Sequence, residues 1–124
     1  MKLDNQTAFD RVYQHLVDQG RQAYVRHVGC KYRTENGLKC AIGALIPDEL
    51  YSPKLEGGTL RDIIRFPEIK ELFSGVDIDL LGQLQITHDV KNATWSSAGF
   101  VGHRRMKALA EQFNLTYTKP EKTQ

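Results

Sequence analysis

Residues 30–42 read CKYRTENGLKCAI, and this stretch sets the fold class. An Asn-Gly pair between two runs of alternating apolar and polar residues is typical of a β-hairpin, because both turn residues tolerate a positive φ. A three-residue loop with Gly37 in the left-handed region places Arg33 opposite Lys39. The split into an apolar and a polar face suits a half-buried antiparallel pair. The apolar face of the predicted hairpin carries Cys30, Tyr32, Leu38, Cys40 and Ile42.

Segments with helical periodicity lie on both sides of this hairpin. Residues 7–19 repeat apolar side chains at the spacing of one buried helical stripe, and Gly20 is well placed to end the segment. Similar patterns predict further helices over residues 59–65, 77–89 and 98–113. We therefore predict a mostly helical α+β domain over residues 1–115, with a small antiparallel hairpin packed against several short helices. Residues 116–124 are predicted to form a flexible polar tail.

The composition is that of an ordinary globular protein. Of 124 residues, 40% are hydrophobic and 26% are charged, and the net charge is +2, which lacks the basic excess of a nucleic-acid-binding domain. No apolar run approaches the roughly 20 residues that a membrane-spanning helix needs. The first residues are polar and lack the apolar region of a secretory signal. We therefore expect a cytoplasmic protein whose partner is neither a membrane nor a sequence-specific nucleic acid.

The two cysteines, Cys30 and Cys40, are the first candidates for chemistry. Structural zinc sites usually present their ligands in pairs two to four residues apart, which is much closer than these two. Both cysteines fall on the apolar face of the predicted hairpin, where a thiol behaves as a small hydrophobic group. We expect both to be reduced, buried and free of metal. A zinc site would need two further ligands from among His27, His88 and His103.

The pair His88-Asp89 is similar to part of the metal shell of HD-type phosphohydrolases. Those enzymes need a further Asp downstream, and no Asp follows Asp89. The alternative is that His88 simply packs at the last turn of a helix, where the dipole suits it. The sequence also has no nucleophile elbow and no glycine-rich phosphate loop. We therefore expect no catalytic residue and no cofactor.

The central stretch of the chain resembles an uncharacterised family of small proteins encoded by tailed bacteriophages. The shared signature is C-x-Y-R…G-L-K-C-A-I-G-x-L-I-P-D-E-x-Y over residues 30–51, followed by His88-Asp89 and Trp95. The likeness extends over about residues 7–115. This resemblance implies an accessory protein in the cytoplasm of the host cell, of a class that often counters host defences, and it implies no activity.

Two groups of basic residues carry the predicted binding site. Arg33 and Lys39 face each other across the hairpin, and like charges in that position destabilise it by roughly a few tenths of a kcal/mol. Arg104 and Arg105 lie early in the last predicted helix, where the helix dipole disfavours cations. An anion would relieve both arrangements, and Trp95 lies close enough in sequence to contribute an aromatic face. The alternative is that these long side chains extend into water at little cost.

We expect a non-catalytic protein that sequesters an anionic, nucleotide-type signal of the host, enclosed between the subunits of a homo-oligomer. The alternative is an inhibitor that binds and blocks a host defence or metabolic protein directly. A nucleotide site needs cations and an aromatic side chain that converge on one pocket. A docking surface needs a broader patch with apolar or arginine anchors. The arrangement of the basic residues therefore distinguishes the two functions.

Overall fold

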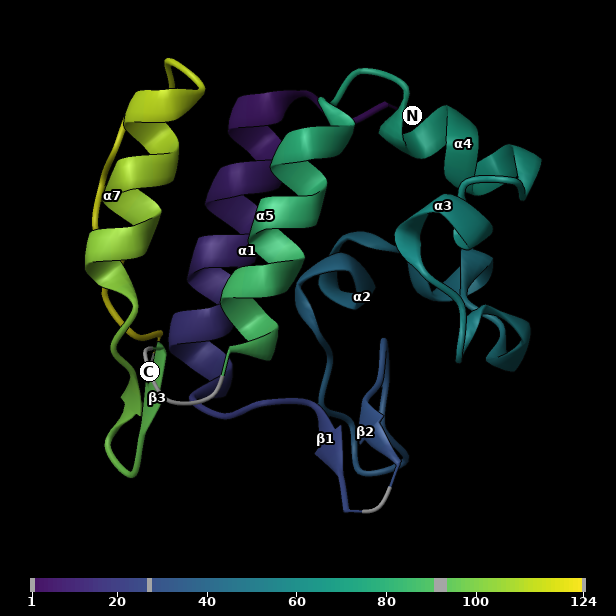
Figure 1. Cartoon of the computed structure of the whole chain (residues 1–124), viewed down its shortest axis with the longest axis horizontal. Helices are drawn as coiled ribbons and strands as arrows, with labels where there is room; N and C mark the ends of the chain where they lie inside the picture. Colours follow the sequence, from purple (N-terminus) through teal and green to yellow (C-terminus); the bar gives the residue numbers. More distant parts are fainter. Residues whose placement is uncertain (1, 27, 91–93, 124) are drawn as a thin grey trace.

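The computed structural model describes residues 2–26, 28–90 and 94–123. Helices α1 and α5 lie side by side in the middle of the molecule, α7 packs beyond them on one side, and α2, α3 and α4 lie on the other (Figure 1). Two short antiparallel ribbons lie at one end of the helices. The class is thus a mostly helical α+β fold, as predicted. The helices are α1 (Asn5–Gln19), α2 (Ala41–Leu45), α3 (Leu60–Ile63), α4 (Pro67–Phe73), α5 (Ile78–Asp89) and α7 (His103–Gln112), with 3-10 turns η1 (Asp48–Leu50) and η2 (Pro53–Leu55).

Helix α1 forms the centre of the core. It begins two residues earlier than predicted, because the carboxylate of Asp4 accepts a hydrogen bond from the Thr7 amide at 2.7 Å and caps the helix. Gly20 ends it in the left-handed conformation, with φ 72°. The predicted stripe meets α2, α5 and the second ribbon. Its members Phe9, Val12, Tyr13 and Leu16 are buried and Val17 is half-buried, and Ala8 is buried beside them.

The hairpin turn has the predicted register. Arg33 and Lys39 form an antiparallel bridge, and Gly37 lies in the left-handed region with φ 89°. The predicted second strand is wrong beyond Cys40, because α2 starts at Ala41. The Cys40 thiol caps α2 by accepting from the Gly43 amide at 3.3 Å. Apolar residues in this stretch suit a helix that buries one face on α1 and α5 as well as they suit a strand.

The first strand of the predicted hairpin begins by pairing with residues that precede it in the chain, not with residues after the turn. Strand β2 (Gly29–Cys30) pairs with β1 (Tyr24–Val25). Cys30 is exposed, so the prediction that both cysteines are buried is wrong for Cys30 and confirmed for Cys40. Since α2 replaces the far end of the second strand, Cys30 pairs with Tyr24 of β1 instead.

The last predicted helix starts too early. Strands β3 (Trp95–Ser96) and β4 (Gly99–Phe100) form a second ribbon, and α7 begins only at His103. Gly99 has φ 120°, a backbone conformation that a helix cannot contain. Residues 91–93, which precede this ribbon in the sequence, lie outside the described part of the chain.

The segment after α7 runs back along α1. The Gln6 side chain exchanges two hydrogen bonds with the backbone of Thr116, at 2.9 and 3.0 Å. Further along, Asp18 accepts from the Thr123 amide at 2.7 Å. These contacts place residues 116–123 against α1, and the flexibility predicted for this tail stays a prediction. Among the residues that the structure describes, no helix combines the length and the apolar character that a membrane span needs.

Candidate functional site

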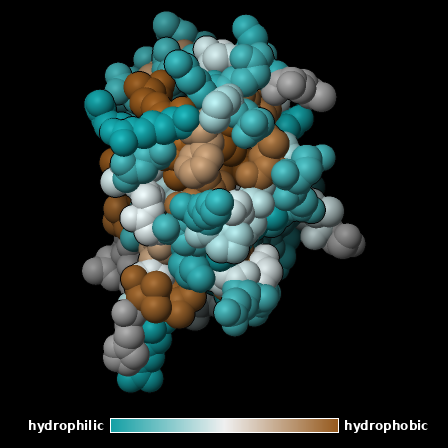
Figure 2. All heavy atoms as spheres, turned by 90° about the vertical axis from the view of Figure 1, so that its right-hand side faces the viewer, coloured by the Kyte–Doolittle hydropathy of each residue, from teal (hydrophilic) through white to brown (hydrophobic). Residues whose placement is uncertain are grey.

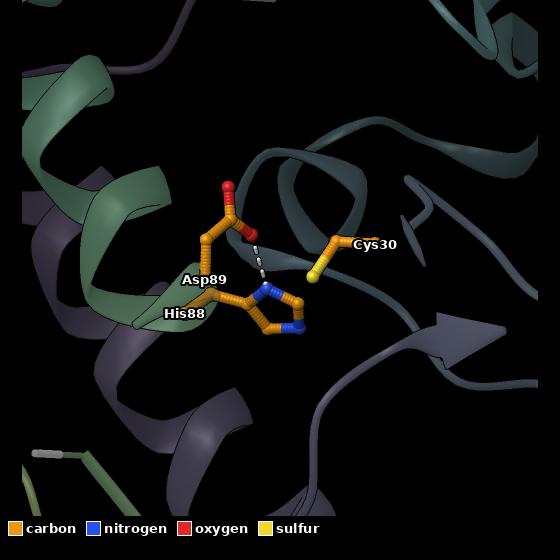
Figure 3. A group of neighbouring side chains, drawn as sticks. All are labelled: Cys30, His88 and Asp89. Carbon is orange, nitrogen blue, oxygen red and sulfur yellow. Dashed lines mark hydrogen bonds and ion pairs between the residues drawn. The ribbon is translucent and has the colours of Figure 1, made fainter. Parts of the chain in front are cut away.

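The fold brings the two parts of the sequence signature together at the end of α5. Cys30 from β2 meets His88 and Asp89 there, and one potential ligand atom from each of the three lies within 4.8 Å of the other two (Figure 3). His88 is fully buried, whereas Cys30 and Asp89 are exposed. Cys30 and Asp89, together with Tyr32 and Glu56, line a pocket of about 350 Å³. Among the described residues, this is the one group of three His, Cys, Asp or Glu side chains whose ligand atoms lie close enough to hold a metal ion.

Both ring nitrogens of His88 are already engaged. The amide of Ala23 donates to Nε2 at 2.9 Å, so that nitrogen presents its lone pair and the ring proton lies on Nδ1. Nδ1 then donates to the Asp89 carboxylate at 2.8 Å. A histidine that binds a metal through one ring nitrogen usually donates a hydrogen bond from the other nitrogen to an acceptor. If Nδ1 of His88 bound a metal, the other nitrogen, Nε2, would instead face the amide donor of Ala23. The geometry therefore suits a histidine that fixes the β1 segment to α5 better than it suits a metal ligand or a general base.

Neither cysteine is set up as a nucleophile. Burial, followed by the nearby Asp89 carboxylate, raises the pKa of the Cys30 thiol to about 11. Burial likewise raises the pKa of Cys40 to about 12. Reactive cysteines instead have a lowered pKa in a cationic setting. His27, one of the candidate further ligands of the zinc alternative, lies outside the described residues.

We expect Cys30 to react slowly with iodoacetamide at pH 8, in the native chain and without added metal. A pKa of about 11 leaves roughly a hundredfold less thiolate at that pH than an ordinary cysteine has. Mass spectrometry of the alkylated peptides gives the rate, and the urea-unfolded chain supplies the reference. Equimolar Zn²⁺ should leave the rate unchanged, because His88 has no free lone pair toward Cys30. A rate equal to that of the unfolded chain, or strong protection by zinc, would contradict this assignment.

Arg33 and Lys39 lie together as predicted, but they share an internal anion. Nη1 of Arg33 lies 2.7 Å from Oδ1 of Asp48, and Nζ of Lys39 lies 3.9 Å from the same oxygen. The guanidinium also stacks on the Tyr51 ring, with Cζ 4.7 Å from its centroid. The like-charge repulsion inferred from the sequence is therefore offset by a carboxylate of the chain itself.

The other predicted site residues are used inside the fold. Arg105 donates to Oγ1 of Thr87 at 2.6 Å and to Oε1 of Gln83 at 2.8 Å, near the carboxyl end of α5, where the helix dipole favours a cation. The indole of Trp95 donates to the backbone carbonyl of His88 at 2.8 Å. Both side chains thus hold α7 and the second ribbon against α5. Arg105 was assigned to an anion site because its charge lies early in a helix, where the dipole disfavours a cation. That reason is wrong, because Thr87 and Gln83 already accept hydrogen bonds from Arg105.

The four basic residues do not form one pocket. Arg104 and Arg105 lie on α7, whereas Arg33 contacts the segment that follows α2, on the opposite side of the α1–α5 pair (Figure 1). Arg104 is exposed. Within one chain the four cations and Trp95 therefore do not line one pocket, whereas Arg33 and Lys39 form a local cation pair; anion binding by these residues stays a prediction.

Sequence reasoning missed three residues that organise this pair. Glu56 accepts from the backbone amides of Tyr32 and Arg33, both at 3.0 Å, and from the Tyr51 hydroxyl at 2.6 Å. Asp48 and Tyr51 lie in the shared signature just after Pro47, and this position was the available signal for them. Glu56 lies beyond the signature, and nothing in the spacing of the three residues indicates that they turn back onto Arg33.

A larger groove lies elsewhere, between α4 and the segment from α2 to η1. It has a volume of about 540 Å³. Arg11 of α1 borders it, as do Glu68 and Glu71 of α4. Figure 2 views the molecule from the side of α3 and α4 and shows apolar side chains between hydrophilic ones on that face. The apolar lining of the groove consists of Leu3, Leu45, Pro47, Leu50, Pro67 and Leu72.

Comparison with known proteins finds no matching family model, no similar curated protein and no similar solved structure. The resemblance to small phage proteins therefore stays a prediction, and the function has to be argued from the geometry.

Proposed function

We propose that this chain is a phage accessory protein that acts without catalysis, by binding a host protein and blocking it. The phage setting comes from the sequence resemblance. Non-catalytic action is supported by His88, whose nitrogens are both engaged, and by the raised pKa of both thiols. Of the two binding functions considered from the sequence, direct docking on a protein is favoured, because the basic residues do not converge on one ligand pocket.

The observation that carries this proposal is the apolar groove beside α4. Apolar grooves of this kind commonly bind the apolar face of an amphipathic helix. Glu68 and Glu71 are both exposed on the same rim of the groove, one helical turn apart. The occupant that fits is a helix of the host protein whose apolar stripe fills the groove and whose lysines or arginines face these two carboxylates.

We expect Leu50→Lys to abolish capture of the host protein. Leu50 is half-buried in the groove wall, so a lysine places a charge against the apolar face of the bound helix while the chain can still fold. The measurement is affinity purification from host lysate, with the captured protein quantified by mass spectrometry. Val28→Lys is the matched control, since Val28 is 69% exposed and lies outside the groove.

The wild-type chain and Val28→Lys should retain the same host protein in near-stoichiometric amounts, and Leu50→Lys should not. Equal capture by both variants, or no host protein captured by the wild type, would contradict docking through this groove.

Capture of an anionic, nucleotide-type ligand stays a second candidate function. It is favoured by one observation, the two cations that meet at Asp48. A site formed by Arg33 and Lys39 alone is too small to enclose a whole nucleotide, but it suits a single phosphate group.

A further inference from the structure

Arg33 is held in place more firmly than a surface arginine. Its Nη2 donates to the carbonyl of Ile46 at 2.6 Å, its guanidinium lies over the Tyr51 ring, and its side chain is only 15% exposed. Glu56 fixes both the backbone amide of Arg33 and the hydroxyl of Tyr51. One carboxylate thus orients the cation and the ring beneath it, so the guanidinium loses little freedom when a ligand binds.

The anion that faces Arg33 is held far less firmly. The side chain of Asp48 is 85% exposed, and it lies in the three-residue turn η1. Water screens the exposed carboxylate of Asp48, which weakens its attraction to Arg33. A competing anion can therefore replace the Asp48 carboxylate at small cost while Arg33 stays where it is.

The two cations also have unused hydrogen-bonding capacity. A guanidinium carries five N–H donors, and the described residues supply side-chain or backbone acceptors for its Nη1 and Nη2 only. Nε of Arg33 is the single buried side-chain nitrogen or oxygen in the described part of the chain that lacks a partner. Nζ of Lys39 lies 3.9 Å from Asp48, beyond hydrogen-bonding distance. A phosphate presents three oxygens and more charge than one carboxylate, and so can reach donors on both residues.

We propose that Arg33 and Lys39 form a binding site for the phosphate group of a small molecule, and that Asp48 occupies this site in the free protein. The phosphate displaces Asp48, accepts hydrogen bonds from Nη1 of Arg33 and contacts the ammonium of Lys39. Tyr51 supports the guanidinium from below. This inference rests on the second candidate function, and it is independent of the groove and its host protein.

The test is the affinity of Asp48→Asn for inorganic phosphate, measured at low ionic strength by NMR titration of the backbone amides. Removal of the internal anion should lower the Kd for phosphate at least fivefold relative to the wild type. Glu49→Gln is the matched control, because it removes one exposed carboxylate from the same turn but does not contact Arg33 or Lys39. Its Kd should equal that of the wild type. The amides that shift should be those around Arg33, Lys39 and Asp48.

Two further arms identify the ligand chemistry. Adenosine monophosphate should bind Asp48→Asn as phosphate does, and adenosine, which lacks the phosphate, should not bind. The double variant Asp48→Asn/Lys39→Gln should lose the gain in affinity. Equal phosphate affinity of Asp48→Asn and Glu49→Gln would overturn the proposal and leave Arg33–Asp48 as a structural ion pair. Binding of adenosine as tight as that of its monophosphate would overturn it too. Neither outcome depends on Leu50, so failure here is distinguishable from failure of docking.

Discussion

Gly43→Ala is expected to destabilise the fold by about 3 kcal/mol or more, because a methyl group does not fit where α2 crosses the hairpin. A Cβ at this position would lie 2.0 Å from the carbonyl oxygen of Tyr32 and 2.8 Å from its carbonyl carbon. These are backbone atoms, and they are anchored. The Tyr32 carbonyl accepts from the Cys40 amide at 3.1 Å, and the Tyr32 amide donates to Glu56. The hairpin therefore cannot retreat without loss of those hydrogen bonds.

The measurement is urea unfolding followed by circular dichroism. The matched control is Gly82→Ala in the middle of α5, where nothing lies within 4 Å of an added Cβ. Alanine there should stabilise the chain by about 0.5–1 kcal/mol, since it restricts the unfolded backbone and favours the helix. A free energy of unfolding for Gly43→Ala within about 1 kcal/mol of the wild type would show that α2 and the hairpin can move apart.

Prediction from sequence succeeded for the long helices and the hairpin turn, and it failed for α2. The stripes of α1 and α5 have helical periodicity over several turns, and such patterns predict helices well. The turn at Gly37 was predictable because only a few residues adopt its backbone conformation. The five-residue helix α2 was not, since residues 41–45 are apolar in a pattern that also fits a strand. Its position is decided by tertiary contacts, among them the Ile42 amide, which donates to the Gln85 side chain at 3.0 Å.

The candidate site was less predictable than the fold. Sequence placed Arg33 opposite Lys39 correctly, because register follows from the turn. It could not show that Asp48 forms an ion pair with Arg33, or that Arg105 donates hydrogen bonds to Thr87 and Gln83 of α5. Both contacts depend on how distant segments pack. Charge patterns in a sequence show which side chains need a partner, but not which partner the fold supplies.

Glu56→Gln is expected to cost about 2–3 kcal/mol of stability, because the carboxylate makes three hydrogen bonds that an amide cannot reproduce. Oε1 accepts from the Tyr32 amide, and Oε2 accepts from the Arg33 amide and the Tyr51 hydroxyl. In glutamine one of these oxygens becomes an NH₂ group, which would face a backbone N–H donor in either orientation. One backbone donor is then left without an acceptor in a half-buried position, and the charge that strengthens the other bonds is lost.

Urea unfolding again gives the change in free energy, and Glu49→Gln controls for the loss of one negative charge from the same region. Glu49 is exposed, so its substitution should change stability by less than about 0.5 kcal/mol. The loss of Glu56 should also release Arg33 and Tyr51, which share its carboxylate. We therefore expect the backbone amide of Arg33 to exchange with solvent deuterium much faster in Glu56→Gln than in Glu49→Gln. Equal stability and equal exchange in the two variants would mean that Glu56 does not hold Arg33 and Tyr51 in place.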